Sequence, residues 1–296
     1  MKRIFAALTL LALCVSLAGC SAVDYLKASR LYKNQEYAQA LPLYESLGDF
    51  ADSAKMAEIC SQKADYTAAE ALLAAKDYEA ALPLYEGLGM YADSPLKAIT
   101  CRYENGLRYL DNGAFEQAIL WLEPLGNYES SIDRTNLARW QWLSQQTHSY
   151  IIQAITGESR IMTLEPAEDG TLLLVLERNG HLLGLPYDTV FELTLTRGEK
   201  VATYRVSCRS ESDMVIEETA EGQVELSHII SGKPLQIGNF SQTVTDMEGN
   251  AVTSNEAADA IIVHAVLAEN AQLVAQYLPK LLENTGVQIT MQDLGF

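Results

Sequence analysis

The stretch YAQALPLYESLGDFADSA, Tyr37–Ala54, returns as YEAALPLYEGLGMYADSP at Tyr78–Pro95, with 12 of 18 positions identical. A more divergent third copy, FEQAILWLEPLGNYESSI, begins at Phe115. Self-similarity at a period of about 40 residues is typical of stacked helical hairpins, because one hairpin cannot bury its apolar face without a neighbour. The first half of the chain is therefore predicted to be an α-solenoid.

Each copy carries the pattern of a short helix and of the residues that end it. Apolar residues recur at spacings of three and four, which gives one buried stripe. A glycine then ends the helix, an Asp-Ser or Ser-Ser pair is expected to cap the next helix, and the aromatic residue before that pair is expected to pack on the helix that follows. These positions are Gly48, Gly89 and Gly126, then Asp52-Ser53, Asp93-Ser94 and Ser130-Ser131, and Phe50, Tyr91 and Tyr128.

The copies resemble tetratricopeptide repeats. Residues at the family's small and aromatic positions are Ala40, Ala81, Ala118, Tyr44, Tyr85, Gly106 and Tyr109. The copies are 41 and then 37 residues apart, more than the family's period of about 34, and the Asp-Ser pair replaces its closing proline. We therefore expect long first helices, with Ala51–Lys76 nearly continuous. The resemblance implies that the repeats bind a protein or peptide on a face formed by first helices, here with Lys27, Arg30, Lys33, Glu70 and Asn105.

The first twenty residues, MKRIFAALTLLALCVSLAGC, combine two cations, an apolar run and small residues, which is typical of an export signal and too short for a membrane-spanning helix. The segment Leu17–Cys20 resembles the lipobox of bacterial lipoproteins. That resemblance implies cleavage before Cys20 and a diacylglycerol on its sulfur, and two acyl chains give stable membrane attachment. We expect a lipid-anchored protein on the extracytoplasmic face of the cell membrane. The alternative is a signal cut elsewhere, with Cys20 an incidental thiol.

The formal charge of −18 becomes −20 when Lys2 and Arg3 leave with the leader. A negative field repels phosphate backbones and anionic headgroups, so we expect neither nucleic-acid binding nor electrostatic binding to lipid surfaces. The same charge also keeps an exported protein soluble.

Patterns that would indicate catalysis or metal binding are not found in the sequence. Cys60 and Cys101 occupy one repeat position, where the third copy has Ala138, so a small buried side chain is expected there and not a disulfide. Cys208 has no partner in the sequence, the histidines are scattered singly, and Glu217 and Glu218 are interpreted as part of a solvated strand. We expect no enzyme activity, no cofactor and no metal.

From Ser159 the periodicity changes to two, which predicts an antiparallel meander of about six strands. The expected strands are 172–177, 181–185, 189–196, 201–208, 214–219 and 224–230, with turns at Asn179-Gly180, Arg197-Gly198 and Glu221-Gly222. Residues 231–255 are interpreted as a mobile flap or as an irregular connection with a short strand near Leu235–Phe240.

Two long helices complete the prediction. The first, from Ser131 to Gly157, is expected to cover the end of the repeats; Trp140 and Trp142 cannot face the same side of it, so one is exposed or each packs on a different domain. The second begins with a capping box at Thr253–Glu256, ends at Gly286, and is apolar enough to require burial against the sheet. His264 on this helix is interpreted as a core residue, with a ligand as the alternative. A last strand, Val287–Met291, is expected to bring Leu294 and Phe296 into the core.

The predicted class is α + β: a solenoid of helical hairpins, then an antiparallel β-meander packed on a long C-terminal helix. The expected parts are a signal peptide (1–19), a lipidated tether (20–24), the repeats (25–157) and the sheet domain (158–296). The expected function is that of a membrane-anchored adaptor that holds an unknown envelope protein or peptide. The alternative is a carrier of a lipid or small molecule, in a cavity between the sheet and the C-terminal helix.

Overall fold

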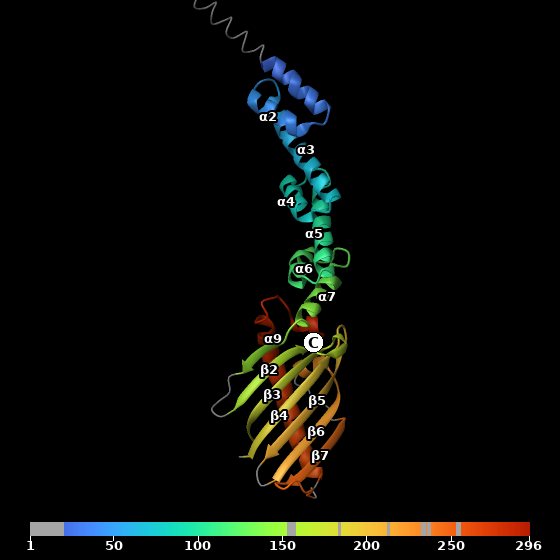
Figure 1. The fold of residues 1–296 in the computed structure, drawn as a ribbon, viewed down its shortest axis with the longest axis vertical. Helices are drawn as coiled ribbons and strands as arrows, with labels where there is room; N and C mark the ends of the chain where they lie inside the picture. The colour runs from blue at the N-terminus through green and yellow to red at the C-terminus, as the bar shows by residue number, and fades with distance from the viewer. Residues whose placement is uncertain are drawn as a thin grey trace, which may run out of the picture. The chain divides into compact units, whose positions relative to one another are not determined.

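The computed structural model describes residues 21–152, 158–182, 185–211, 214–231, 235, 238–252 and 256–296, without the side chains of 181, 182, 185, 214 and 256–265. The fold is mixed, with a helical N-terminal region and an antiparallel sheet (Figure 1). Contacts divide the chain into two compact units. One extends to Arg108 and includes Pro124–Gly126; the other comprises Tyr109–Glu123 and Asn127–Phe296.

The first unit is helical throughout its regular structure. Its long helix α3 contacts both α2 and α4, and the prediction of a nearly continuous helix over 51–76 is confirmed by α3. The helices are 21–33, α2 (Tyr37–Leu47), α3 (Ser53–Ala74), α4 (Tyr78–Leu88) and α5 (Ser94–Asp111), whose last residues belong to the second unit.

The buried positions of this unit follow the repeat. Ala40 and Tyr44 on α2 are fully buried, as are Ala81 and Tyr85 on α4. Both repeat cysteines, at 60 and 101, are fully buried free thiols, which confirms the prediction of a small packed side chain at that position.

The second unit joins a helical pair to the sheet. Helix α6 packs on α7, and α7 contacts β2 and the C-terminal turn η3. The helical elements are α6 (Phe115–Leu122), the first residue of η1 (Glu123–Leu125), α7 (Ser131–Leu143), η2 (Glu168–Gly170), α8 (Leu226–Ile230), α9 (Glu256–Glu283) and η3 (Met291–Leu294).

The described part of the sheet has seven strands in chain order, each antiparallel to the next. One face packs on α9, which runs behind the strands in Figure 1, and the apolar core lies between them. The strands are β1 (His148–Ile152), β2 (Ser159–Pro166), β3 (Leu172–Leu182), β4 (Leu185–Leu195), β5 (Val201–Glu211), β6 (Met214–Glu225) and β7 (Asn239–Asp246).

The helix predicted from Ser131 to Gly157 is wrong beyond Leu143, because the chain turns there and forms β1. In β1 the side chains alternate: His148 and Ile152 are buried and Ile151 is exposed. That period of two suits an edge strand with one covered face. The sheet therefore begins before residue 158, where the sequence placed its start.

Two of the three predicted hairpin turns are also wrong. Asn179 and Gly180 lie inside β3, opposite Asp188 and Tyr187, and the ladder continues to Leu182 paired with Leu185. Likewise Glu221 and Gly222 lie inside β6. The turn at Arg197-Gly198 is confirmed, since Gly198 has φ +79° between β4 and β5.

Close packing explains why the residue at position 222, inside strand β6, is a glycine. It lies opposite Tyr204, and a Cβ at Gly222 would come within 2.9 Å of the tyrosine ring. The ring of Tyr204 is fully buried, and it occupies the space that a side chain at residue 222 would otherwise fill.

The C-terminal part departs from the prediction at its short elements. The strand expected over 224–230 ends at Glu225, because Leu226 and Ile229 bury themselves at helical spacing in α8. The expected strand Val287–Met291 is absent from the described residues; residues 287–290 are irregular, and η3 follows from Met291 with a capping box between Thr290 and Asp293.

Two predictions about this end of the chain hold. Helix α9 ends at Glu283, close to Gly286, Leu294 is buried in the core, and Phe296 packs against it. The short strand expected near Leu235–Phe240 is wrong in its placement, because Leu235 lies outside any strand and β7 runs from Asn239 to Asp246.

Candidate functional site

Each of the first two hairpins is closed by a tyrosine that reaches the Asp of the Asp-Ser pair. Tyr25 donates its hydroxyl to Asp52 Oδ1 at 2.6 Å, and Tyr66 donates to Asp93 Oδ1 at 2.5 Å. The two residues of each pair are 27 positions apart in the sequence. The predicted cap is wrong at Asp52, which makes no side-chain hydrogen bond to α3, because its carboxylate accepts from the tyrosine instead.

The aromatic residue before the pair packs on the same tyrosine. Tyr25 meets Tyr44 and Phe50 edge to face, at ring-centroid distances of 5.9 and 6.0 Å. Tyr66 meets Tyr85 and Tyr91 at 6.1 and 5.7 Å. Phe50 and Tyr91 therefore contact the first helix of their own hairpin, and packing of these aromatic residues on the helix that follows stays a prediction. We call each set of tyrosine, aspartate and two aromatic residues a tyrosine clasp.

The clasp changes the acidity of its polar members. The hydrogen bond to Asp93 raises the pKa of Tyr66 to about 12, and the same bond lowers the pKa of Asp93. The pKa of Tyr25 is raised by its bond to Asp52. Both hydroxyls are therefore protonated at neutral pH, and each clasp is a structural donor–acceptor pair.

The five residues expected on the binding face differ in their availability. Glu70 accepts a hydrogen bond from the Tyr85 hydroxyl at 2.5 Å and pairs with Lys97 at 3.0 Å, while Asn105 is fully buried. Neither is a free surface group. The other three, Lys27, Arg30 and Lys33, are exposed on the helix over 21–33.

A cation also lies between the first hairpin and the next helix. The ammonium group of Lys63 on α3 lies 5.1 Å from the ring centre of Tyr37 and 5.9 Å from that of Tyr32. This cation–π contact joins α3 to both helices of the first hairpin.

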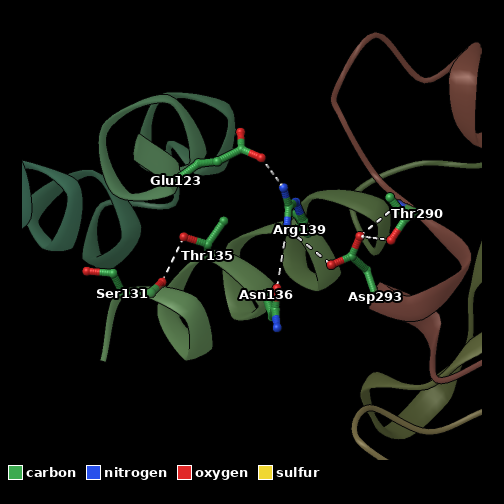
Figure 2. A network of polar contacts seen from close by, with 7 residues as sticks. All are labelled: Glu123, Ser131, Thr135, Asn136, Arg139, Thr290 and Asp293. Atoms are coloured by element: carbon green, nitrogen blue, oxygen red, sulfur yellow. Dashed lines mark hydrogen bonds and ion pairs between the residues drawn. The ribbon is translucent and has the colours of Figure 1, made fainter. Parts of the chain in front are cut away.

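In the second unit, Arg139 of α7 connects the last helical pair to the C-terminal turn (Figure 2). Its guanidinium bonds Glu123 at 2.5 Å and Asp293 at 3.1 Å, and both contacts are largely shielded from solvent on the arginine side. Asp293 in turn accepts from the backbone N–H and hydroxyl of Thr290, at 2.7 and 2.8 Å. This network ties α7 to η3.

Both tryptophans of α7 pack on the core of the sheet. Trp140 is buried and donates its indole N–H to the Gly170 carbonyl at 3.1 Å. Trp142 stacks on His148 at 4.9 Å between ring centres, and burial lowers the pKa of His148. The expectation that one tryptophan is exposed, or that the two pack on different domains, is wrong.

The remaining candidate residues carry little reactive chemistry. Burial, and then the nearby Glu218 carboxylate, raise the pKa of Cys208 to about 12, so its thiol is protonated and a poor nucleophile. Within the described ranges, no cluster of three or more His, Cys, Asp or Glu side chains is arranged to hold a metal ion. No helix in those ranges is both long and apolar enough to cross a membrane.

Several predicted features lie where the structure gives no description. Cys20, the expected lipidation site, precedes the first described residue, and the capping box at Thr253–Glu256 and the side chain of His264 also fall outside.

Comparison with known proteins returned no matching family model, no matching curated protein and no matching solved structure.

Proposed function

We propose that this chain is a lipid-anchored bacterial protein of the extracytoplasmic membrane face, and that its hairpins form a solenoid like that of tetratricopeptide repeats, which holds an envelope protein or peptide. The proposal combines the signal and lipobox pattern of the first twenty residues with the recurring hairpins. The anchor places the repeats next to the membrane, and the repeats supply the binding surface.

The observation that carries the proposal is the recurrence of the tyrosine clasp. Tyr25 with Asp52 and Tyr66 with Asp93 repeat the same bond at the same sequence separation. Such equivalence between neighbouring units is typical of repeat proteins, in which each unit contacts its neighbours through one recurring interface. Repeat proteins of this kind commonly present extended binding surfaces.

The lipid anchor is tested by expressing the full chain in a bacterium and fractionating the cells. The mature protein is expected in the membrane fraction, with an N-terminal mass that includes a diacylglycerol on Cys20. Cys20→Ser abolishes both results, whereas Cys14→Ser, which changes a leader residue, leaves both unchanged. An unmodified mature N-terminus would refute the anchor.

The binding face is tested by photo-crosslinking in the native envelope. A photoreactive residue in place of Arg30 is expected to give one defined adduct with an envelope protein. The matched position is Gln39 on α2, which is also exposed and which should give no such adduct. Equal labelling from both positions, or none from Lys27, Arg30 or Lys33, would contradict the proposed face.

A further inference from the structure

A line of polar side chains crosses the face of the sheet that α9 covers. The register places one residue of each strand from β2 to β7 at the same level, each directly opposite the next. Two positions along the strands, Leu176, Phe191 and Val206 are fully buried on the same face. We call this line the polar row; its members are Arg160, Arg178, Thr189, Cys208, Glu218 and Gln242.

The row is buried although it is polar. Arg178 is 5% exposed, Thr189 1% and Glu218 3%. Helix α9 adds Asn270, which is fully buried. Asn270 lies three to four residues from Leu267 and Val274, which belong to the core, so its amide is on the side of α9 that faces the sheet.

Several of these groups have no hydrogen-bond partner in the described part of the chain. They are both amide atoms of Asn270, the Thr189 hydroxyl, and the Nε–H groups of Arg160 and Arg178. A buried polar group without a partner costs about 1–3 kcal/mol, and such groups in native proteins usually meet water or a ligand. Several of them on the inward face of the sheet and on the helix that packs against it therefore indicate a polar occupant.

The charges of the row are separated along it. At one end Arg160 pairs with Glu158 at 2.7 Å and Arg178 pairs with Glu269 of α9, and both of these carboxylates are partly exposed. At the other end Glu218 accepts a hydrogen bond from Gln242 at 2.9 Å. The short side chains of Thr189 and Cys208 lie between the two ends.

The charge sum decides which kind of ligand fits. Two guanidinium groups face three carboxylates, those of residues 158, 269 and 218, so the cluster has an excess of one negative charge. A simple anion would increase that excess, and an apolar lipid tail would leave the polar groups without partners. A ligand with an ammonium group at Glu218 and a carboxylate at the arginine Nε–H groups satisfies both ends.

A surface pocket lies near the arginine end of the row. A surface pocket of about 440 Å³ at the ends of β3, β4 and β5 is lined by Gly180, Tyr187 and neighbouring residues. Tyr187 stands two positions from Thr189 on the same strand, and the Arg178 guanidinium lies 5.3 Å from its ring centre.

We propose that the polar row and Asn270 form a binding site for a small zwitterion with a free ammonium and a free carboxylate, that is, an amino acid or a short peptide. Strands lie about 4.8 Å apart, so the backbones of Arg178 and Glu218, three spacings apart, are separated by roughly 14 Å. After allowance for the two side chains, this leaves room for about one to three residues at roughly 3.5 Å each. The site lies on the sheet and is independent of the adaptor function proposed for the hairpins.

The test is calorimetric titration and thermal unfolding of the full mature chain in detergent. The probe is L-alanyl-L-alanine, with acetate and ethylammonium as single-charge controls and a panel of amino acids and tripeptides alongside. At least one zwitterion is expected to bind and to raise the unfolding midpoint, whereas the single-charge controls do neither.

Two variants separate binding from stability. Thr189→Val and Asn270→Leu remove unpartnered polar groups, so the unliganded midpoint should stay equal or rise, while zwitterion affinity falls at least tenfold. Thr163→Val changes a residue on the opposite face of β2 and should leave the affinity unchanged.

Three results would overturn the site. The first is that no zwitterion in the panel binds, which would mean that water alone fills the row. The second is that a zwitterion binds Asn270→Leu as tightly as it binds the wild type. The third is that native mass spectrometry detects a lipid released from the sheet unit. None of these results depends on Cys20 or on the hairpins, so failure of this site and failure of the adaptor proposal are distinguishable.

Discussion

The hydroxyl of Tyr66 has an effect on the pH dependence of stability. Its bond to Asp93 raises the pKa of Tyr66 from 10.0 to about 12 in the folded protein. The folded state therefore keeps this proton where the unfolded chain loses it. The stabilisation is complete below pH 10 and is lost as the pH rises through about 12. In Tyr66→Phe, the midpoint of urea unfolding should accordingly fall less between pH 9 and pH 11.5 than in wild type.

The matched control for this prediction is Tyr91→Phe, which removes another hydroxyl of the same clasp and leaves the bond between Tyr66 and Asp93 in place. This variant should keep the wild-type pH dependence. If Tyr66→Phe and Tyr91→Phe gave the same alkaline slope, the bond between Tyr66 and Asp93 would not affect stability.

Gly222 supports a second prediction at the level of single residues. A Cβ there would come within 2.9 Å of the Tyr204 ring, which is buried and has no room to withdraw. Overpacking of this kind costs about 1–3 kcal/mol. Gly222→Ala should therefore lower the free energy of unfolding by that amount in chemical denaturation. The double variant Gly222→Ala/Tyr204→Leu should show less than the sum of the two single losses, and full additivity would rule out this contact.

Helix α4 offers two glycines with opposite expectations. Gly87 lies inside the helix, is exposed, and has open space where a Cβ would be. Gly87→Ala should stabilise the protein by about 0.5–1 kcal/mol, because alanine is the better helix former. Gly89 ends the helix with φ +57°, so Gly89→Ala should destabilise it by about 1–2 kcal/mol. Thermal unfolding measures the change in stability of each variant. A change in the same direction for both variants would contradict the assignment of the helix end.

The helices were predictable from the sequence because their signals are local. Apolar spacing located α2 and α4, and Gly48 and Gly89 marked their ends, where both residues have positive φ. The repeat also showed that Cys60 and Cys101 share one environment, since an equivalent position recurs in each copy.

The strand ends were not predictable, because non-local packing overrides local turn signals. Asn179-Gly180 has the composition of a tight turn, yet the ladder between β3 and β4 continues past it. Each added pair contributes backbone hydrogen bonds and buries the inner face, which outweighs the turn preference of two residues.

The polar row was beyond the reach of the sequence for a related reason. Its residues lie on six strands, and they share one level only because of the register of every neighbouring pair. The sequence placed Glu218 on a solvated strand, whereas α9 covers that face and leaves Glu218 3% exposed. The sequence carried only a weak signal for this row, namely polar residues at the inward positions of strands whose other inward residues are apolar.

At the scale of the whole molecule, the division of the chain predicts which fragment folds. The sheet unit includes α7 and β1: Trp140, Leu143 and Ile152 lie in its core, and Arg139 bonds Asp293. A fragment that begins at residue 158, the boundary expected from the sequence, loses all of these. Burial of one large apolar side chain contributes about 1.5–3 kcal/mol, so the loss of three amounts to roughly 5–9 kcal/mol, much of the 5–15 kcal/mol that stabilises a typical domain.

Fragment 158–296 should therefore lack a cooperative unfolding transition and bind a hydrophobic dye, because the core side chains that contact Trp140, Leu143 and Ile152 become exposed. Fragment 109–296, which follows the division by contacts, should unfold cooperatively and show the near-ultraviolet dichroism of the packed Trp140 and Trp142. Circular dichroism during thermal unfolding distinguishes the two fragments. Equal cooperativity would mean that β1 and α7 are dispensable, and would move the boundary of the folding unit back to residue 158.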